Sequence, residues 1–317
     1  MKWKRNKKIN VVSTNEEIIR ICEEEGKKKK SHILLGLIVV LLVALGTAGY
    51  FGFRLWKYYQ EYQDDQKLYG DLREAVLQTT DESDQPERST EESMSETDTK
   101  RKQTKKEKDE PPFNVDWAAL KEINRDIIGW VYFTGLPQIS YPILQADDNE
   151  YYVHRTYDLS SDDSKAGSIF MDYRMASDFS SPYSIIYGHN VRDGSMLSDL
   201  ALLKDQKLYE EEPYFWILTP DGNYRYQIFS IFQCHRSADV FQRSFSQWGE
   251  DFSKWQSELQ VRNSMQGDSV KLKEYGHVIA FSTCVQNSFD RTIVCGTYID
   301  GDPIPDPHGR EEVQNDN

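Results

Sequence analysis

The chain has 317 residues, of which 38% are hydrophobic and 28% charged, and this is enough for one or two domains with a hydrophobic core. Its formal net charge of −14 argues against a general nucleic-acid binder, because such proteins present basic surfaces to phosphate. The charge is uneven, since residues 1–32 carry ten Lys or Arg and five Glu while the rest of the chain is strongly acidic.

The first predicted element is a transmembrane helix over residues 33–53. These twenty-one residues contain no charged side chain, and a helix rising about 1.5 Å per residue then crosses a hydrocarbon core of about 30 Å. Lysines 27–30 precede the run, so the positive-inside rule predicts a cytoplasmic basic leader over 1–32. We therefore expect a single-pass cell-membrane protein with a cytoplasmic N-terminus and an extracellular folded part. A cleaved signal peptide is the alternative, although the apolar run is longer than usual for one.

Two segments lead from the membrane to the folded part. Residues 54–78 are polar and aromatic with helical spacing, which predicts a juxtamembrane helix. Residues 79–112 hold eighteen charges and, prolines aside, one apolar side chain, Met94, so they cannot bury enough surface to offset the entropy of ordering. We expect a disordered linker there, then a folded domain over 113–305 and a C-terminal tail over 306–317.

The folded part is predicted to be mainly β. Its short β-rich runs are 129–133, 141–144, 168–171, 184–187, 214–218, 224–232, 277–282 and 292–299. The segment Pro220–Asn223 reads as a hairpin turn, because Gly and Asn tolerate positive φ. Eight short strands with turn signals are typical of an antiparallel or mixed barrel.

Helices are expected at two places around this barrel. Apolar residues with helical spacing between Trp117 and Ile127 predict a short helix capped by Asn114 or Asp116. A second set recurs at steps of three and four from Phe245 to Leu259, which predicts an amphipathic helix inserted before the last strands.

The cysteines indicate a free thiol outside the membrane. Cys234, Cys284 and Cys295 cannot all pair within the chain. Cys295 lies within a strand and is expected in the core, whereas the neighbours Cys234 and His235 would point to opposite faces of a strand. The sequence has no spaced His and Cys ligands, no GxGxxG fingerprint and no Walker loop, so we expect neither a metal nor a cofactor.

Cys284 is the best candidate for a nucleophile. It ends the apolar strand that begins near residue 277, so its thiol can face a cleft while the strand holds it. Arg291 opens the next strand and brings a permanent positive charge beside it. Among the exported histidines, His189 is favoured as proton carrier because it follows an apolar strand at the start of a loop rich in Gly and Asp.

These residues carry a resemblance to a known family. Residues 185–200 around His189, the tripeptide Ser282 to Cys284, and Arg291 resemble the catalytic motifs of class B sortases. Supporting stretches lie at 141–145, 148–153 and 167–174, and all of them stand in the family's order over about residues 115–300. The long helix before the cysteine strand is the feature that separates class B from class A.

The resemblance implies a sortase-type eight-stranded barrel with peripheral helices, acting as a cysteine transpeptidase on Gram-positive bacteria. It implies that Cys284 is the nucleophile, that His189 is general acid and then base, and that Arg291 holds substrate or oxyanion. Asn149, Val153 and Ser282 match positions that line the peptide groove.

The implied partners are surface proteins with a C-terminal sorting motif and an amine acceptor from a peptidoglycan precursor. A pilus-assembling sortase, which uses a pilin lysine as acceptor, is one alternative. A catalytically silent surface-binding module on the same barrel is another.

Overall fold

A computed structural model describes residues 11–79, 110–284 and 289–305, without the side chains of residues 11–16, 31, 79 and 284. The start of the predicted leader, most of the predicted linker and the predicted tail over 306–317 therefore lie outside the described residues. The chain divides into two compact units, with the boundary between residues 60 and 61.

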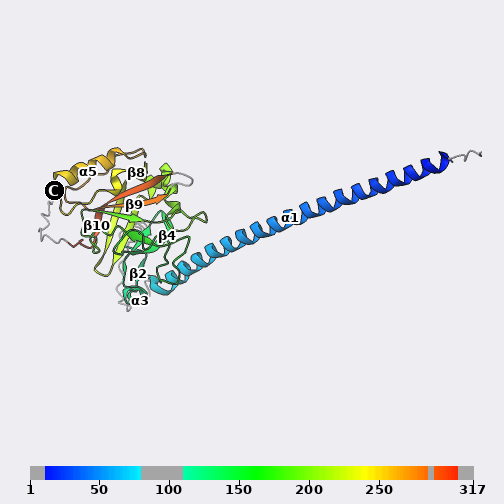
Figure 1. The fold of residues 1–317 in the computed structure, drawn as a ribbon. Coiled ribbons are helices and arrows are strands. Elements are labelled where there is room, and N and C mark those ends of the chain that lie inside the picture. Colours follow the sequence, from blue (N-terminus) through cyan, green and yellow to red (C-terminus); the bar gives the residue numbers. More distant parts are fainter. Residues whose placement is uncertain (1–10, 80–109, 285–288, 306–317) are drawn as a thin grey trace, which may run out of the picture. The chain divides into compact units, whose positions relative to one another are not determined.

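The first unit consists of the larger part of helix α1 (Val11–Val76), which runs without interruption through the residues where the sequence predicted separate segments (Figure 1). The apolar residues 33–53 within it are exposed to the surroundings in this structure. By length and composition, α1 is apolar and long enough to cross a membrane.

The second unit is built on a barrel that eight strands of the described residues close completely (Figure 1). The strands are β3 (Ile127–Phe133), β4 (Leu136–Leu144), β5 (Ile169–Met171), β6 (Tyr183–Tyr187), β7 (Tyr214–Thr219), β8 (Gly222–His235), β9 (Val278–Cys284) and β10 (Asp290–Gly301). Their order around the barrel is β10-β8-β7-β3-β4-β5-β6-β9. The prediction of an eight-stranded barrel is confirmed, and each predicted run overlaps one of these strands.

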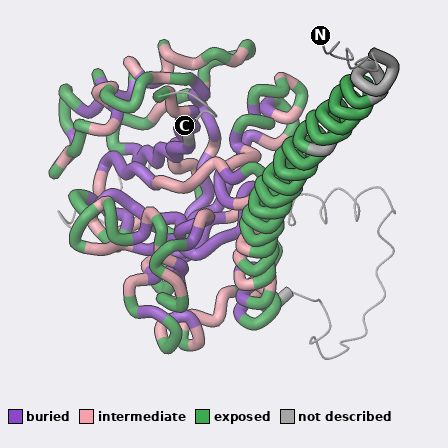
Figure 2. Tube along the Cα trace, turned by 45° about the vertical axis from the view of Figure 1, so that its right-hand side comes forward, coloured by how far each residue is buried: buried purple, intermediate pink, exposed green. Residues whose placement is uncertain are grey.

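The register of the strands decides which side chains share a face. Most neighbours are antiparallel, but β4 pairs with β5 and β6 pairs with β9 in parallel. Alternate residues point inward, and the rings of Phe133, Phe215 and Phe281 meet there with centroids 5.0 to 5.1 Å apart. The strands are accordingly largely buried, whereas exposed residues gather on the loops and along α1 (Figure 2).

Short helices surround the barrel. They are α3 (Trp117–Ile123), η1 (Ser198–Lys204), α4 (Gln206–Glu211), η2 (Asp239–Phe241) and α5 (Glu250–Val261). Asp116 caps α3 as expected, with its carboxylate accepting from the amide of Ala119 at 3.0 Å. The helix ends at Ile123, so Ile127 belongs to β3 instead.

The inserted helix is shorter than its apolar pattern indicated. α5 begins at Glu250 behind Gly249, so Phe245 and Trp248 lie in the preceding loop. Both still join the apolar cluster on this side of the barrel, where Trp248 packs edge-on against His277 and Phe245 against Phe252. A loop that packs on the core can therefore continue a helical apolar spacing without being a helix.

The folded unit extends further toward the N-terminus than the expected start at residue 113. Tyr69, Leu72 and Val76 at the end of α1 are buried, and the hydroxyl of Tyr69 donates to the carbonyl of Gly167 at 2.6 Å. Directly after α1, strand β1 (Leu77–Thr79) pairs antiparallel with β2 (Phe113–Val115). The end of the predicted juxtamembrane helix is thus part of the packed structure.

Candidate active site

Strands β9 and β10 and the loop after β6 bring the three predicted catalytic residues into one row. Tyr187 of β6 is the parallel partner of Ser282 on β9, and the amide of Gly188 donates to the carbonyl of Ser282 at 3.2 Å. His189 directly follows Gly188 on the loop after β6, so it lies next to the end of β9 that carries Cys284. On the other side of β9, Cys284 is the antiparallel partner of Arg291. Neighbouring strands lie about 4.8 Å apart, so the backbones of Cys284 and Arg291 are adjacent.

The ring of His189 is held by its surroundings on the neighbouring loop. Its Nε2 lies 2.6 Å from the carbonyl oxygen of Val153, and because a carbonyl only accepts, Nε2 carries the proton in this contact. The ring also stacks on that of His154, with centroids 5.5 Å apart and planes inclined by 24°. A neutral His189 therefore has its unprotonated nitrogen at Nδ1.

The electrostatics of the site favour neutral His189. Burial lowers the pKa of the imidazole below its usual 6.5, and the positive charges of His154 and Arg291 lower it further. The hydrogen bond to Val153 opposes this shift without cancelling it. The ring is thus prepared to accept a proton near neutral pH.

Arg291 lies half-buried at the start of β10. Its Nη1 donates to the carbonyl of the adjacent Asp290 at 3.1 Å, and its charge acts on His189. Antiparallel partners project from the same face of a sheet, so the guanidinium shares its face with Cys284. The register thus places Cys284 and Arg291 on adjacent strands.

The other two cysteines of the barrel are poor nucleophiles. Cys295 is completely buried in the core, as expected, and burial raises the pKa of its thiol. Cys234 is half-buried, and burial raises the pKa of its thiol to about 11. Both thiols are therefore protonated at neutral pH and lack the thiolate that reacts.

The residues expected to line the peptide groove have different positions. Val153 is adjacent to His189, whose ring proton its carbonyl accepts. Ser282 lies on the same face of β9 as Cys284, two residues earlier, but only 3% of it is exposed. The side chain of Asn149 is occupied, since its Nδ2 donates to Asp172 at 2.9 Å and its Oδ1 accepts from the amide of Tyr173.

Asp172 is a residue that sequence reasoning missed. Its carboxylate is fully buried and accepts hydrogen bonds from Arg174, Asn149 and the hydroxyl of Tyr187, two residues before His189. Burial alone would raise the pKa of Asp172, but these donors together hold it below its usual value. The segment 167–174 contains the signal that could have identified Asp172, because Asp172 and Arg174 stand two residues apart directly after a strand.

Metal chemistry has no candidate ligand set in the described ranges 11–79, 110–284 and 289–305, where no three His, Cys, Asp or Glu side chains gather as metal ligands. What the site offers instead is a cysteine strand flanked by an imidazole and a guanidinium.

Sequence comparison finds relatives of one kind, although no family model matches the chain. Sortase B of Listeria monocytogenes is 33% identical over 165 residues, which cover 52% of this chain and 65% of that protein. Sortase B of Staphylococcus aureus is 28% identical over 168 residues, which cover 53% of this chain and 67% of that protein. The chain thus spans about two thirds of the length of these relatives.

Solved structures agree with these relatives in fold. Sortase B from B. anthracis in complex with AAEK1 matches with a TM-score of 0.58 at 21% identity, covering 76% of this chain and 99% of that chain. Sortase B of Clostridium perfringens matches with a TM-score of 0.53 at 24% identity, covering 58% of this chain and 99% of that chain. A sortase B complexed with triglycine matches with a TM-score of 0.53 at 25% identity, covering 64% of this chain and 92% of that chain. The barrel, the order of the motifs and these relatives agree, and together they support a class B sortase.

Proposed function

We propose that this protein is a membrane-anchored cysteine transpeptidase that cleaves a C-terminal sorting motif and transfers the new end to an amine. The observation that carries the proposal is the row formed by Cys284 and Arg291 on two paired strands and His189 on the loop beside them. A nucleophile, a proton carrier and a fixed cation in such a row are the groups that acyl transfer needs.

In the first half-reaction, the Cys284 sulfur attacks the carbonyl carbon of the scissile amide while neutral His189 takes the thiol proton. Arg291 stabilises the negative charge that develops on the carbonyl oxygen. The C–N bond then breaks, and the imidazolium gives its proton to the leaving amine. The products are a thioester on Cys284 and the released downstream peptide.

In the second half-reaction, an amine attacks the thioester carbonyl. His189 removes a proton from the attacking nitrogen and returns it to the departing sulfur, so that the thiol is restored. The result is a new amide bond, and no cofactor is needed for any step. The lowered pKa of His189 suits this role, because a neutral ring must be available at the start of both halves.

The substrate classes follow from the family and are part of the proposal. The S. aureus sortase B has been solved as a substrate complex, and a sortase B has been solved with triglycine. For this chain we propose a surface protein with a sorting motif as donor and an amine of a cell-wall peptide precursor as acceptor. Asn149, Val153 and Ser282 are proposed to contact the donor peptide.

The proposed location is the outer face of the cell membrane. The apolar residues 33–53 of α1 supply the span, and the lysines at 27–30 favour an N-terminus on the cytoplasmic side. In this arrangement the barrel meets secreted substrates where they emerge from the membrane.

The experiment uses the full chain in detergent micelles with a library of pentapeptides and an added amine, followed by mass spectrometry. We expect one motif class to give both a Cys284 thioester and an amine-capped product, and Cys284→Ala to give neither. A pilin-type lysine peptide as preferred acceptor would support the pilus-assembling alternative. Absence of any adduct on wild-type Cys284, with the protein folded, would support the silent binding module.

A further inference from the structure

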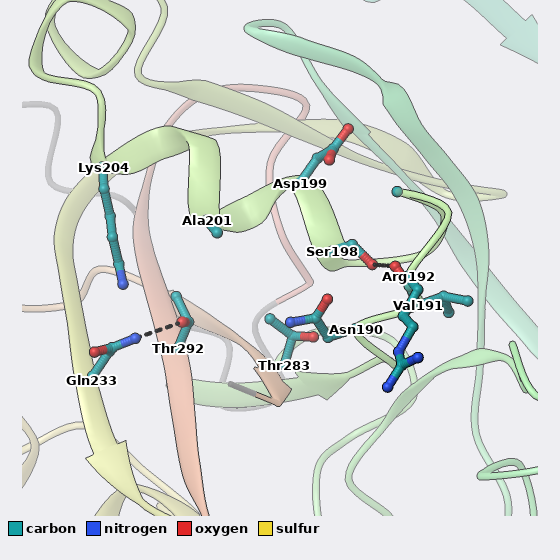
Figure 3. A pocket seen from close by; sticks show the side chains of 11 residues that line it. Asn190, Val191, Arg192, Ser198, Asp199, Ala201, Lys204, Gln233, Thr283 and Thr292 are labelled. Carbon is teal, nitrogen blue, oxygen red and sulfur yellow. Dashed lines mark hydrogen bonds between the residues drawn. The ribbon is translucent and has the colours of Figure 1, made fainter. Parts of the chain in front are cut away.

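A polar cavity lies on the reverse side of the catalytic row. Cys284 and Arg291 are register partners, and so are their chain neighbours Thr283 and Thr292. Because successive residues on a strand point to opposite faces, the two threonines point away from the catalytic face. They line a cavity of about 380 Å³ at the end of the barrel (Figure 3).

The loop that follows His189 forms the opposite wall of this cavity. Asn190, the next residue, lines it, and the loop is fixed by a hydrogen bond from the amide of Leu197 to the carbonyl of His189 at 3.1 Å. Each predicted catalytic residue therefore has a chain neighbour in the cavity wall. A molecule bound there would touch all three catalytic segments from behind.

The cavity contains a buried hydroxyl that lacks a partner. Thr283 is only 2% exposed, and its Oγ1 makes no hydrogen bond with any described residue. Figure 3 shows this side chain directed into the cavity beside Asn190. Leaving such a group unpaired costs free energy, so a hydrogen-bonding occupant would be stabilised at this point.

The charges around the cavity favour an anionic occupant. Lys204 on η1 extends toward Gln233 and Thr292 on the strands (Figure 3), and Arg192 adds a second cation. The acidic residue of the lining is Asp199, and its Oδ2 already accepts a hydrogen bond at 2.6 Å from Gln138, which does not line the cavity. An excess of positive charge stands out in a chain with a net charge of −14.

The donors in the wall match a carboxylate. The amide of Gln233 already donates to the Oγ1 of Thr292 at 3.5 Å, which leaves the ammonium of Lys204 and the hydroxyl of Thr283 as donors. An ionised carboxylate only accepts and has two oxygens to share between them. We infer that this cavity binds a carboxylate group of a small acid or short peptide. Two sources have the same chemistry: the amine acceptor, which rests on the proposed function, or a free acid that binds independently of the reaction.

The direct test is binding of N-acetylglycine to the full chain in micelles, followed by NMR or calorimetry. We expect saturable binding of N-acetylglycine and none of N-acetylglycinamide, which lacks the charge. Lys204→Met should weaken binding about tenfold or more, since the ion-assisted hydrogen bond is lost, and Thr283→Val should weaken it less. Lys207→Met is the matched control, because Lys207 lies three residues further on the surface and pairs loosely with Glu211.

Each outcome of the binding test decides the inference. No saturable binding by the wild type would overturn the site. Equal binding of the acid and the amide would overturn the carboxylate assignment, and equal weakening by Lys204→Met and Lys207→Met would remove the cavity as the location.

The second test distinguishes the two sources by comparing triglycine with triglycinamide as the amine in the transfer reaction. If the acceptor supplies the carboxylate, Lys204→Met raises the KM for triglycine about tenfold and not that for triglycinamide. A parallel change for both amines excludes the acceptor and leaves the free acid as ligand. If no variant or wild type cleaves any peptide, the proposed function fails, while binding of N-acetylglycine still decides the cavity.

Discussion

The rings of His154 and His189 lie stacked, with centroids 5.5 Å apart, and the carbonyl of Val153, the residue before His154, accepts from His189. Two imidazoles at this distance cannot both be protonated without repulsion. His154 is exposed, whereas His189 is half-buried. The first prediction concerns this pair.

We expect His154→Phe to raise the pKa of His189. Phenylalanine keeps a ring that can stack on His189 but carries no positive charge. In the wild type, the charge of His154 lowers the pKa of His189 together with burial and Arg291. The pH at which His189 becomes protonated should therefore rise, and NMR of the imidazole carbons would measure this shift. His235→Phe, on the exposed end of β8, is the control and should leave this titration unchanged. A pKa that falls or stays constant in His154→Phe would contradict the contribution of His154.

We expect Arg291→Lys to keep the fold and lose about 10²–10³ in kcat/KM, the usual range when an oxyanion donor is removed. Lysine preserves the charge beside Cys284 but lacks the planar fork that spans two acceptors. Circular dichroism checks the fold, and peptide cleavage gives the rate. Activity within about twofold of wild type, as for an ordinary surface substitution, would remove Arg291 from the site.

We expect Leu72→Ala to destabilise the folded unit by about 2–5 kcal/mol, because it leaves a cavity under the end of α1. Leu72 is 3% exposed, whereas Glu74 on the same helix turn is exposed. Glu74→Ala is therefore the matched control, with an expected change within about 0.5 kcal/mol. Thermal unfolding of the full chain measures both. Equal melting temperatures for the two variants would mean that this part of α1 does not stabilise the barrel.

We expect Asp172→Asn to lower stability at pH 7 on the order of 2 kcal/mol, between the limits for exposed and buried ion pairs, because Arg174 loses its charged partner. The pKa of Asp172 is lower in the folded state than its usual 3.8. As the pH falls, the unfolded chain then binds the proton first. The stabilisation of the fold by this carboxylate is therefore complete above about pH 5 and is lost as the pH falls through the folded-state pKa.

The difference between wild type and Asp172→Asn should therefore shrink on acidification, which denaturant unfolding at several pH values would detect. Asp163→Asn is the control, since its pair with Lys165 is exposed. A difference that grows on acidification would contradict the assigned direction.

The strands could be predicted because their signal is local. Runs such as 184–187 are rich in aromatic and β-branched residues and end at turn residues, and this alone predicts a strand. Cys284 and Arg291 could be paired for the same reason, since a short interval between two strands predicts a hairpin. Once a strand is predicted, the position of the residues directly after its end is predicted as well.

Features that depend on contacts far apart in sequence were not predictable in this way. Tyr69 is buried because it meets Gly167, ninety-eight residues later. The stacking of His154 on His189 depends on how a long loop returns to the barrel. Phe245 and Trp248 followed the helical spacing of the next helix although they lie before it, because a loop that packs on the core is also apolar at intervals.

The pairing of β1 with β2 has a consequence for the integrity of the protein under proteolysis. Leu77 and Val115 are direct partners, so the chain returns after residue 79 to the place it left. Thr79 and Phe113 are also register partners, so the pairing of β1 with β2 does not depend on the length of the intervening residues. A single protease cut inside them would nick the polypeptide without shedding the enzyme, because Tyr69, Leu72 and Val76 still bind the barrel to the end of α1.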